Sequence, residues 1–262
     1  MSTLSFYWPS IKNEVVKLKR TFALWLSVIS ALFIPVIYFF YYLMKYEGLI
    51  PKDGENPWNR FISQQINNAS PLLIPMFIVL VTSLVVQIEH KALGIKHLFT
   101  LPIPKWSVYY GKLIVVIGLV LFTYILFISS ALLGGYIVGG IHKDLQLWEF
   151  TPDIQRYIKL LFRSFIGVLG IIGLQFWLSF RIKNFIIPLG IGLVLFITGL
   201  IVFRAEESIY YPYAYSMLSL FSLRGEDINT LVWLPKVSVY SLGYFLVFSI
   251  LGFLDIRRMN IK

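Results

Sequence analysis

The sequence predicts an all-α integral membrane protein, built as a bundle of six transmembrane helices. Of its 262 residues, 58% are hydrophobic and 14% are charged, whereas soluble domains have about 45–50% apolar and about 25% charged residues. The apolar residues gather in six blocks, and an uncharged block of about 18 residues is long enough for a helix to cross a bilayer. A soluble helical protein with a very large core would not need six separate blocks.

Each block predicts a helix rather than a strand, because an isolated apolar stretch in lipid must satisfy its own backbone hydrogen bonds. No repeat, low-complexity segment or linker divides the chain, so residues 1–262 are predicted to form one transmembrane domain. The predicted spans lie near residues 22–44, 71–88, 113–138, 158–180, 185–203 and 237–254.

Lysine and arginine in the short connections predict which way the bundle faces. The net charge is +10, and this excess falls on one side of the predicted spans, which the positive-inside rule makes cytoplasmic. We therefore expect a multi-pass membrane protein with both termini in the cytoplasm. The basic charge is thus a topology signal and predicts no nucleic-acid partner. The residues are Lys12, Lys17, Lys19, Arg20, Lys91, Lys96, Lys105, Lys112, Arg181, Lys183, Arg257, Arg258 and Lys262.

An amphipathic helix is predicted before the first span. Trp8, Ile11, Val15, Leu18 and Phe22 recur at intervals of three and four residues, which places them on one helical face. Such a helix would lie flat at the cytoplasmic interface, with its lysines near anionic head groups. The same charges are also compatible with a simple basic topology signal that has no further function.

The second connection, Glu89–Lys112, is much longer than the roughly 2–8 residues that helix–helix connections commonly need. Its first half can form a short helix, which Gly94 interrupts and Pro102 and Pro104 end. Two interpretations are open: a segment that transmits force from a partner, or a basic loop that only fixes topology. The candidate coupling residues are Glu89, Lys91, Gly94, Lys96, Pro102, Pro104 and Lys105.

The outward connection 204–236 is rich in aromatic residues, such as Tyr210, Tyr213 and Trp233. Tyrosine and tryptophan favour the membrane–water boundary. Residues 208–223 are too short to cross a membrane and too apolar to hang in water, so they predict a re-entrant or interface-lying helical segment before the last span. A lid that meets amphipathic substrates and an aromatic belt without a substrate role are both compatible with it.

Several function classes are excluded or disfavoured. The chain has no cysteine, which excludes disulfides and thiolate chemistry. No phosphate-binding loop is present, and the three histidines have no zinc-binding spacing. The span centres contain no Asp, Glu or Lys, which argues against an ion-coupled transporter. We therefore predict no catalytic residue, no metal and no cofactor in this chain.

The second connection resembles that of ABC-2-type permease subunits of ATP-binding-cassette transporters. Glu89, Gly94, Leu98-Phe99, Pro102-Ile103-Pro104-Lys105 and Gly111-Lys112 occupy the positions of the family's acidic residue, glycine, apolar pair, proline–basic turn and lysine. Ile95 departs from the threonine that many members carry. Within the family, Trp177–Phe185, Gly190-Ile191-Gly192 and Tyr210–Ala214 resemble the lantibiotic-immunity permeases.

This resemblance implies a non-enzymatic transport subunit that works as a dimer with a second permease chain, identical or paralogous. ATP and Mg²⁺ are then expected on separate ABC ATPase chains, which dock on the second connection. It further implies export, or clearance from the membrane, of an amphipathic substrate such as a lantibiotic-like peptide, a lipid or a drug. The alternative from another class is a non-transporting membrane scaffold or sensor whose cytoplasmic loop binds a soluble regulator.

Overall fold

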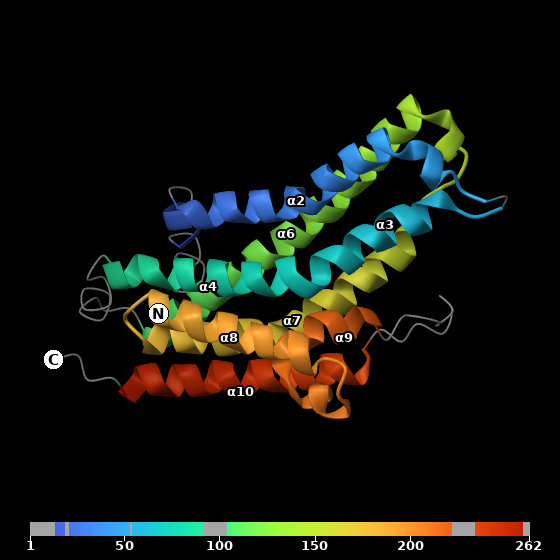
Figure 1. Ribbon diagram of the computed structural model, residues 1–262. Helices are drawn as coiled ribbons and strands as arrows, with labels where there is room; N and C mark the ends of the chain where they lie inside the picture. The colour runs from blue at the N-terminus through green and yellow to red at the C-terminus, as the bar shows by residue number, and fades with distance from the viewer. Residues whose placement is uncertain (1–13, 19–20, 53, 92–103, 222–233, 259–262) are drawn as a thin grey trace.

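The computed structural model describes residues 14–18, 21–52, 54–91, 104–221 and 234–258, and every regular element in these ranges is helical. The long helices run side by side along one elongated bundle (Figure 1). They are α2 (Phe22–Met44), α3 (Pro57–Asn68), α4 (Ile74–Lys91), α6 (Lys105–Ile141), α7 (Ile154–Arg181), α8 (Ile186–Val202) and α10 (Lys236–Arg258). The all-helical class predicted from the sequence is therefore confirmed for the described residues.

Five helical stretches of the described chain are long and apolar enough to cross a membrane. The helix α8 is also apolar but has only 17 residues, which at 1.5 Å per residue gives about 25 Å. Five of the six predicted blocks are thus confirmed as candidate spans. The crossing of the remaining block, near residues 185–203, stays a prediction. The five stretches are Phe22–Met44, Pro57–Ile88, Lys105–Ile141, Ile154–Arg181 and Lys236–Arg258.

The second stretch starts well before the predicted residue 71. Asn56 accepts a hydrogen bond from the backbone N–H of Trp58 at 3.0 Å, and Pro57 occupies the first turn of α3. Both features stabilise a helix start. The helix then continues into α4 through η3 (Ala69–Leu73), a π-helical turn. The sequence prediction missed α3 because that helix is amphipathic rather than continuously apolar.

Two prolines lie at the π turn. Pro71 and Pro75 have no backbone N–H, so each leaves the carbonyl four residues before it without its usual α-helical donor. Between them, the N–H of Ile74 donates to the oxygen of Ala69, five residues back. Such turns interrupt α-helices mostly as single turns and often lie at functional sites.

The helix α6 begins at Lys105, eight residues before the predicted span 113–138. Pro104 precedes it and ends the connection, as expected. Lys112 was predicted to lie in the connection, but it lies inside α6 and is fully buried. A helix of 37 residues is about 55 Å long, which exceeds the hydrocarbon thickness of about 30 Å, and Figure 1 shows α6 crossing the bundle obliquely.

The buried side chains form two clusters along the bundle. One cluster joins α2, α4, α6, α7, α8 and α10. The other surrounds Trp58 and joins α2, α3, α6 and α7 with the short helices η2 (Tyr46–Leu49) and η4 (Lys143–Leu145). The indole N–H of Trp58 donates to the oxygens of Leu147 and Phe150 at 2.9 and 3.0 Å. The connections that contain η2 and η4 therefore pack around Trp58 in a second core.

The helices associate in two groups. The helix α2 packs mainly along α6, whereas α7 packs along α10 and also against α4. The hydroxyl of Ser241 on α10 donates to the oxygen of Gly167 and accepts from the N–H of Gly170, both at 2.9 Å. This bridge requires α7 and α10 to approach closely, and the two glycines permit it.

The aromatic connection after α8 forms three short helices, η5 (Glu206–Tyr210), η6 (Pro212–Ala214) and α9 (Tyr215–Phe221). Tyr213 and Tyr215 are buried against the bundle, whereas Tyr210 is 60% exposed. Some of the aromatic residues that were predicted to form a lid or an aromatic belt are therefore buried in the core instead. The predicted position of this segment at or within the membrane stays a prediction, and Trp233 lies outside the described residues.

Candidate functional site at the basic end of the bundle

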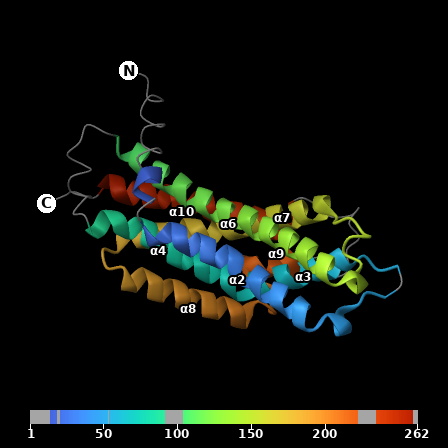
Figure 2. The same cartoon turned by 90° about the horizontal axis from the view of Figure 1, so that it is seen from above.

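Several helix ends gather at one end of the bundle. The last turns of α4, α7 and α10 and the first turns of α6 and α8 lie there, as Figures 1 and 2 show. The described basic residues at this end come from all four of the segments that were used to predict the cytoplasmic side. They are Lys17, Lys91, Lys105, Lys112, Arg181, Lys183, Arg257 and Arg258. We call this region the basic end.

The structure places four of the seven predicted coupling residues at the two helix ends that flank the second connection. Glu89 and Lys91 lie in the last turn of α4, Pro104 immediately precedes α6, and Lys105 is its first residue. The other three, Gly94, Lys96 and Pro102, lie outside the described residues. The segment between the helices is thus shorter than predicted, because α4 and α6 both extend into it.

A buried ion pair joins the N-terminal segment to α6. Residues 14–18 are helical, and the carboxylate of Glu14 pairs with the ammonium group of Lys112. The other carboxylate oxygen accepts from Lys17 at 2.7 Å. Lys112 has no exposed surface and Glu14 only 5%. Removing one partner of a buried pair is strongly destabilising, so this contact fixes where the N-terminal segment lies.

A second ion pair at this end connects α7 to α10. Arg181 donates to the carboxylate of Asp255 at 2.9 Å, and the two side chains are 57% and 26% exposed. Exposed pairs of this kind contribute about 0–1 kcal/mol. This contact therefore aligns the two helix ends without dominating their stability.

A polar cluster that the sequence prediction missed lies deeper in the bundle. Gln175 on α7 is fully buried, and its amide nitrogen donates to the hydroxyl of Ser83 on α4 at 3.1 Å and to the oxygen of Pro188 on α8 at 2.9 Å. The hydroxyl of Tyr213 donates to the amide oxygen of Gln175 at 3.0 Å. Both amide hydrogens and the amide oxygen are thus engaged, and one side chain connects three helices with η6.

The packing around Gln175 requires a glycine on α8. A Cβ atom at Gly192 would lie 2.5 Å from the amide oxygen of Gln175 and 2.7 Å from Val79. Burial also raises the pKa of the Tyr213 phenol well above its usual value, so that this hydroxyl stays protonated and donates. The available sequence signal was Gln175 itself, an amide within a long apolar stretch.

The polar side chains of the described residues form contacts between helices. Among them, no group of three or more His, Asp or Glu side chains is arranged to hold a metal ion. The polar contacts instead connect helices: Glu14 to α6, α7 to α10, and Gln175 to α4 and α8.

A comparison with known families agrees with this arrangement. Residues 10–199 match the family described as ABC-2 family transporter protein, and this range contains every helix from α2 to the greater part of α8. No curated protein matches the chain. Because the match covers more than half of the sequence and the structure carries several candidate spans, this multi-pass membrane protein belongs to the ABC-2 transporter family.

Proposed function

We propose that the chain is the membrane-spanning permease subunit of an ABC transporter, and that a separate ATPase chain supplies the energy. It would export an amphipathic substrate, or clear it from the membrane, with a lantibiotic-like peptide, a lipid or a drug as the candidate classes. The observation that carries this proposal is the basic end, where the flanks of the second connection meet a buried ion pair in a chain of the ABC-2 family.

The basic end faces the cytoplasm in this proposal. Basic residues near the ends of spans favour the cytoplasmic side, and in the structure those from four separate segments lie at the same end. Both termini are then cytoplasmic, α8 crosses as the fifth of six spans, and the membrane is a bacterial plasma membrane. ATP and Mg²⁺ bind only to the partner ATPase.

Movement of the ATPase would enter through Glu89 to Lys105. The segment continues directly into α4 at one end and into α6 at the other. Since Lys112 pairs with Glu14, a displacement of the first turns of α6 also displaces the helix at 14–18. Three elements would therefore respond together when the ATPase chains close on ATP.

A second permease chain, identical or paralogous, completes the proposed transporter. The cavity between α2, α4, α6 and α7 offers only about 30 Å³ to the centre of a water-sized sphere, too little to enclose a whole peptide or lipid. We therefore expect the path for such a substrate to form between two bundles, and nucleotide-driven closure to move the bundles relative to each other.

Co-purification from the native host tests this proposal. The tagged chain, extracted in mild detergent, is expected to bring an ABC ATPase in near-equal amount, as quantified by mass spectrometry. The double variant Lys96→Glu/Lys105→Glu should lose it. The matched control is Lys52→Glu/Lys143→Glu, because these lysines are exposed and belong to the opposite end of the bundle. That control should retain the ATPase.

Two results would contradict the proposal. If the folded chain brings no ATPase, a scaffold or sensor that binds a soluble regulator becomes the better explanation. If an ATPase binds, the complex is reconstituted in liposomes and tested with a cationic lanthionine peptide, a fluorescent phospholipid and an amphipathic dye. An ATP-hydrolysing complex that moves none of the three would contradict transport of this substrate class.

A further inference from the structure

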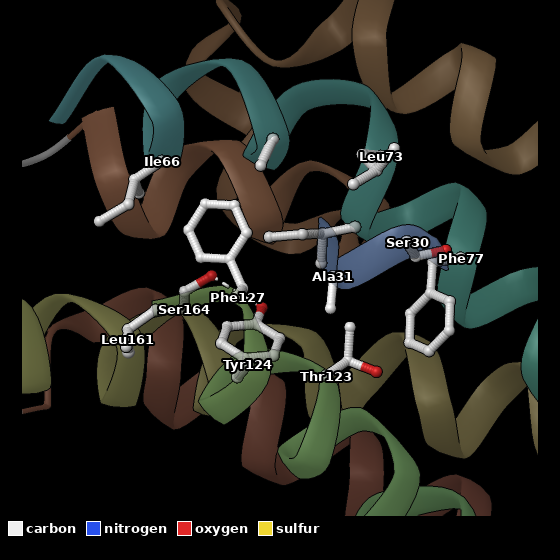
Figure 3. Close-up of a pocket in the computed structure, with 12 residues that line it drawn as sticks. Ser30, Ala31, Ile66, Leu73, Phe77, Thr123, Tyr124, Phe127, Leu161 and Ser164 are labelled. Atoms are coloured by element: carbon white, nitrogen blue, oxygen red, sulfur yellow. Dashed lines mark hydrogen bonds between the residues drawn. The ribbon is translucent and has the colours of Figure 1, made fainter. Parts of the chain in front are cut away.

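A cavity lies in the middle of the bundle, where five elements meet. Side chains from α2, the α3–η3 junction, α4, α6 and α7 line it, as Figure 3 shows. The centre of a water-sized sphere can occupy about 30 Å³ of it, whereas about 10–15 Å³ suffices for one water molecule. Protein interiors rarely contain voids of this size, so the cavity needs an explanation.

The walls of the cavity offer few hydrogen-bonding partners to a water molecule. Most of the lining is apolar, as with Phe77 and Phe127, which face the cavity in Figure 3. The hydroxyls of Tyr124 and Ser164 bond to each other at 2.9 Å, and that of Thr123 donates to the backbone oxygen of Leu119 at 2.8 Å. A buried water needs two to four polar partners, and apolar cavities without them stay dry and bind apolar guests.

Small residues create the space, and partly exposed residues give access to it. Ala31 on α2 and Ala69 in η3 are both buried and contribute only a methyl group to the wall. Leu73, Ile74 and Leu161 also line the cavity, and each is partly exposed. In a bundle that spans a membrane, partly exposed apolar side chains of this kind contact lipid chains rather than water.

The cavity also lies between the two helix groups. On one side are α2 and α6, and on the other are α4 and α7, with the π turn η3 at the junction. A guest at this position contacts both groups. Its presence therefore alters how the groups pack against each other, which an ordinary lipid contact on the outer surface would not do.

We propose that this cavity receives the end of a hydrocarbon chain. The chain can belong to a phospholipid of the surrounding bilayer or to a single-chain amphiphile. Only the second source rests on the proposed transport function, because the amphiphile would then be cargo. The walls recognise the shared chemistry, an unbranched apolar end without a polar group.

Photolabelling of the full chain in liposomes tests the proposal. Two probes carry a diazirine at the end of an alkyl chain: a phospholipid, and a single-chain alkylphosphocholine. After irradiation, mass spectrometry locates the adducts. We expect adducts on cavity residues such as Phe127 and Leu161. In the cavity-filling variants Ala31→Leu and Ala69→Leu these adducts should fall roughly fivefold, because a close-packed site leaves no room for the probe.

Gly118→Leu is the matched control. Gly118 is exposed on α6, and a Cβ atom there would meet nothing within 4 Å, so the added bulk stays outside the cavity and labelling should not change. If the larger substitutions prevent folding, Ala31→Val fills less of the space. Leu161→Ala enlarges the space and should raise labelling roughly twofold, since it leaves a larger void.

Each outcome either supports or overturns the proposal. Cavity adducts from the phospholipid probe support the proposal and identify the bilayer as a source of the chain. Adducts from the alkylphosphocholine alone also support it and identify a single-chain amphiphile. Adducts confined to exposed surfaces, and equal in wild type and filled variants, overturn it. No ATPase takes part, so this result is independent of the co-purification experiment.

Discussion

The ammonium group of Lys112 and the carboxylate of Glu14 pair inside the protein, although the residues are 98 positions apart in the sequence. The pair joins the helix at 14–18 to the first turns of α6. Glu14 has a second partner in Lys17, three residues further along the same helix. The carboxylate of Glu14 therefore holds two cations, one on its own helix and one on α6.

These two contacts predict an order of stabilities. Glu14→Leu removes the carboxylate from both cations and should lower the free energy of unfolding by about 3–5 kcal/mol. Lys112→Met should be less harmful, because Lys17 still pairs with Glu14. The double variant Glu14→Leu/Lys112→Met should recover most of the loss. Thermal midpoints from size-exclusion chromatography in detergent measure the order.

The control for this series is Arg181→Gln, which removes the exposed pair with Asp255 and should change stability by about 0–1 kcal/mol. A double variant that is no more stable than Glu14→Leu would show that the buried pair does not carry the effect.

The cluster around Gln175 predicts a second stability series. Gln175→Leu keeps a similar volume but removes the hydrogen bonds with Ser83, Pro188 and Tyr213. Leaving buried polar groups unsatisfied costs about 1–3 kcal/mol, so the thermal midpoint should fall clearly. Tyr213→Phe removes one of these bonds and should cost less, about 1 kcal/mol.

Tyr210→Phe is the control for this second series, because the Tyr210 ring is largely exposed. Its midpoint should equal that of the wild type. Equal midpoints for Gln175→Leu and the wild type would mean that the cluster does not stabilise the bundle.

The sequence was sufficient for the helices whose apolar length is itself the signal. The first predicted span, 22–44, coincides with α2, and the last, 237–254, lies within α10. The sequence alone was not sufficient to predict where α6 begins. A lysine at position 112 indicates a loop when only its neighbours are considered, and nothing local reveals that a glutamate from residue 14 neutralises it.

In the candidate site, too, local features were predicted from the sequence and contacts between distant segments were not. The flanks of the second connection were predicted from the surplus length and prolines around Pro104, which are local features. Gln175 was missed because its partners come from three other segments, at Ser83, Pro188 and Tyr213. The cavity was missed for a related reason, since small residues such as Ala31 and Ala69 have no pattern until the helices are packed together.

Substituting alanine at two glycines of α8 should change the stability of the protein in opposite directions. At Gly192 a Cβ atom would meet Gln175 at 2.5 Å and Val79 at 2.7 Å, so Gly192→Ala should destabilise by about 1–3 kcal/mol. At Gly190 a Cβ atom would meet nothing within 4 Å, so Gly190→Ala should stabilise the helix by up to about 1 kcal/mol. Thermal midpoints of the two variants measure the difference. Equal responses would contradict the close approach of α7 and α8.

Single-cysteine labelling tests the orientation of the bundle. The chain has no cysteine, so each introduced thiol is unique. Lys52→Cys and Lys143→Cys should react with a membrane-impermeant maleimide in intact cells, whereas Lys183→Cys and Arg258→Cys should react only after permeabilisation. All four positions are exposed. The reverse pattern would place the basic end outside, against the proposed contact with a cytoplasmic ATPase.

The same assay decides whether α8 crosses the membrane. With about 25 Å of length it is shorter than a hydrocarbon core of about 30 Å, but local thinning of the bilayer accommodates a mismatch of this size. The path of the chain favours a crossing, because α10 starts at the far end of the bundle and returns to the basic end (Figure 1). Glu206→Cys should therefore react from outside and Lys183→Cys only from inside. Labelling of both from one side would leave five crossings and show that α8 lies along the membrane instead.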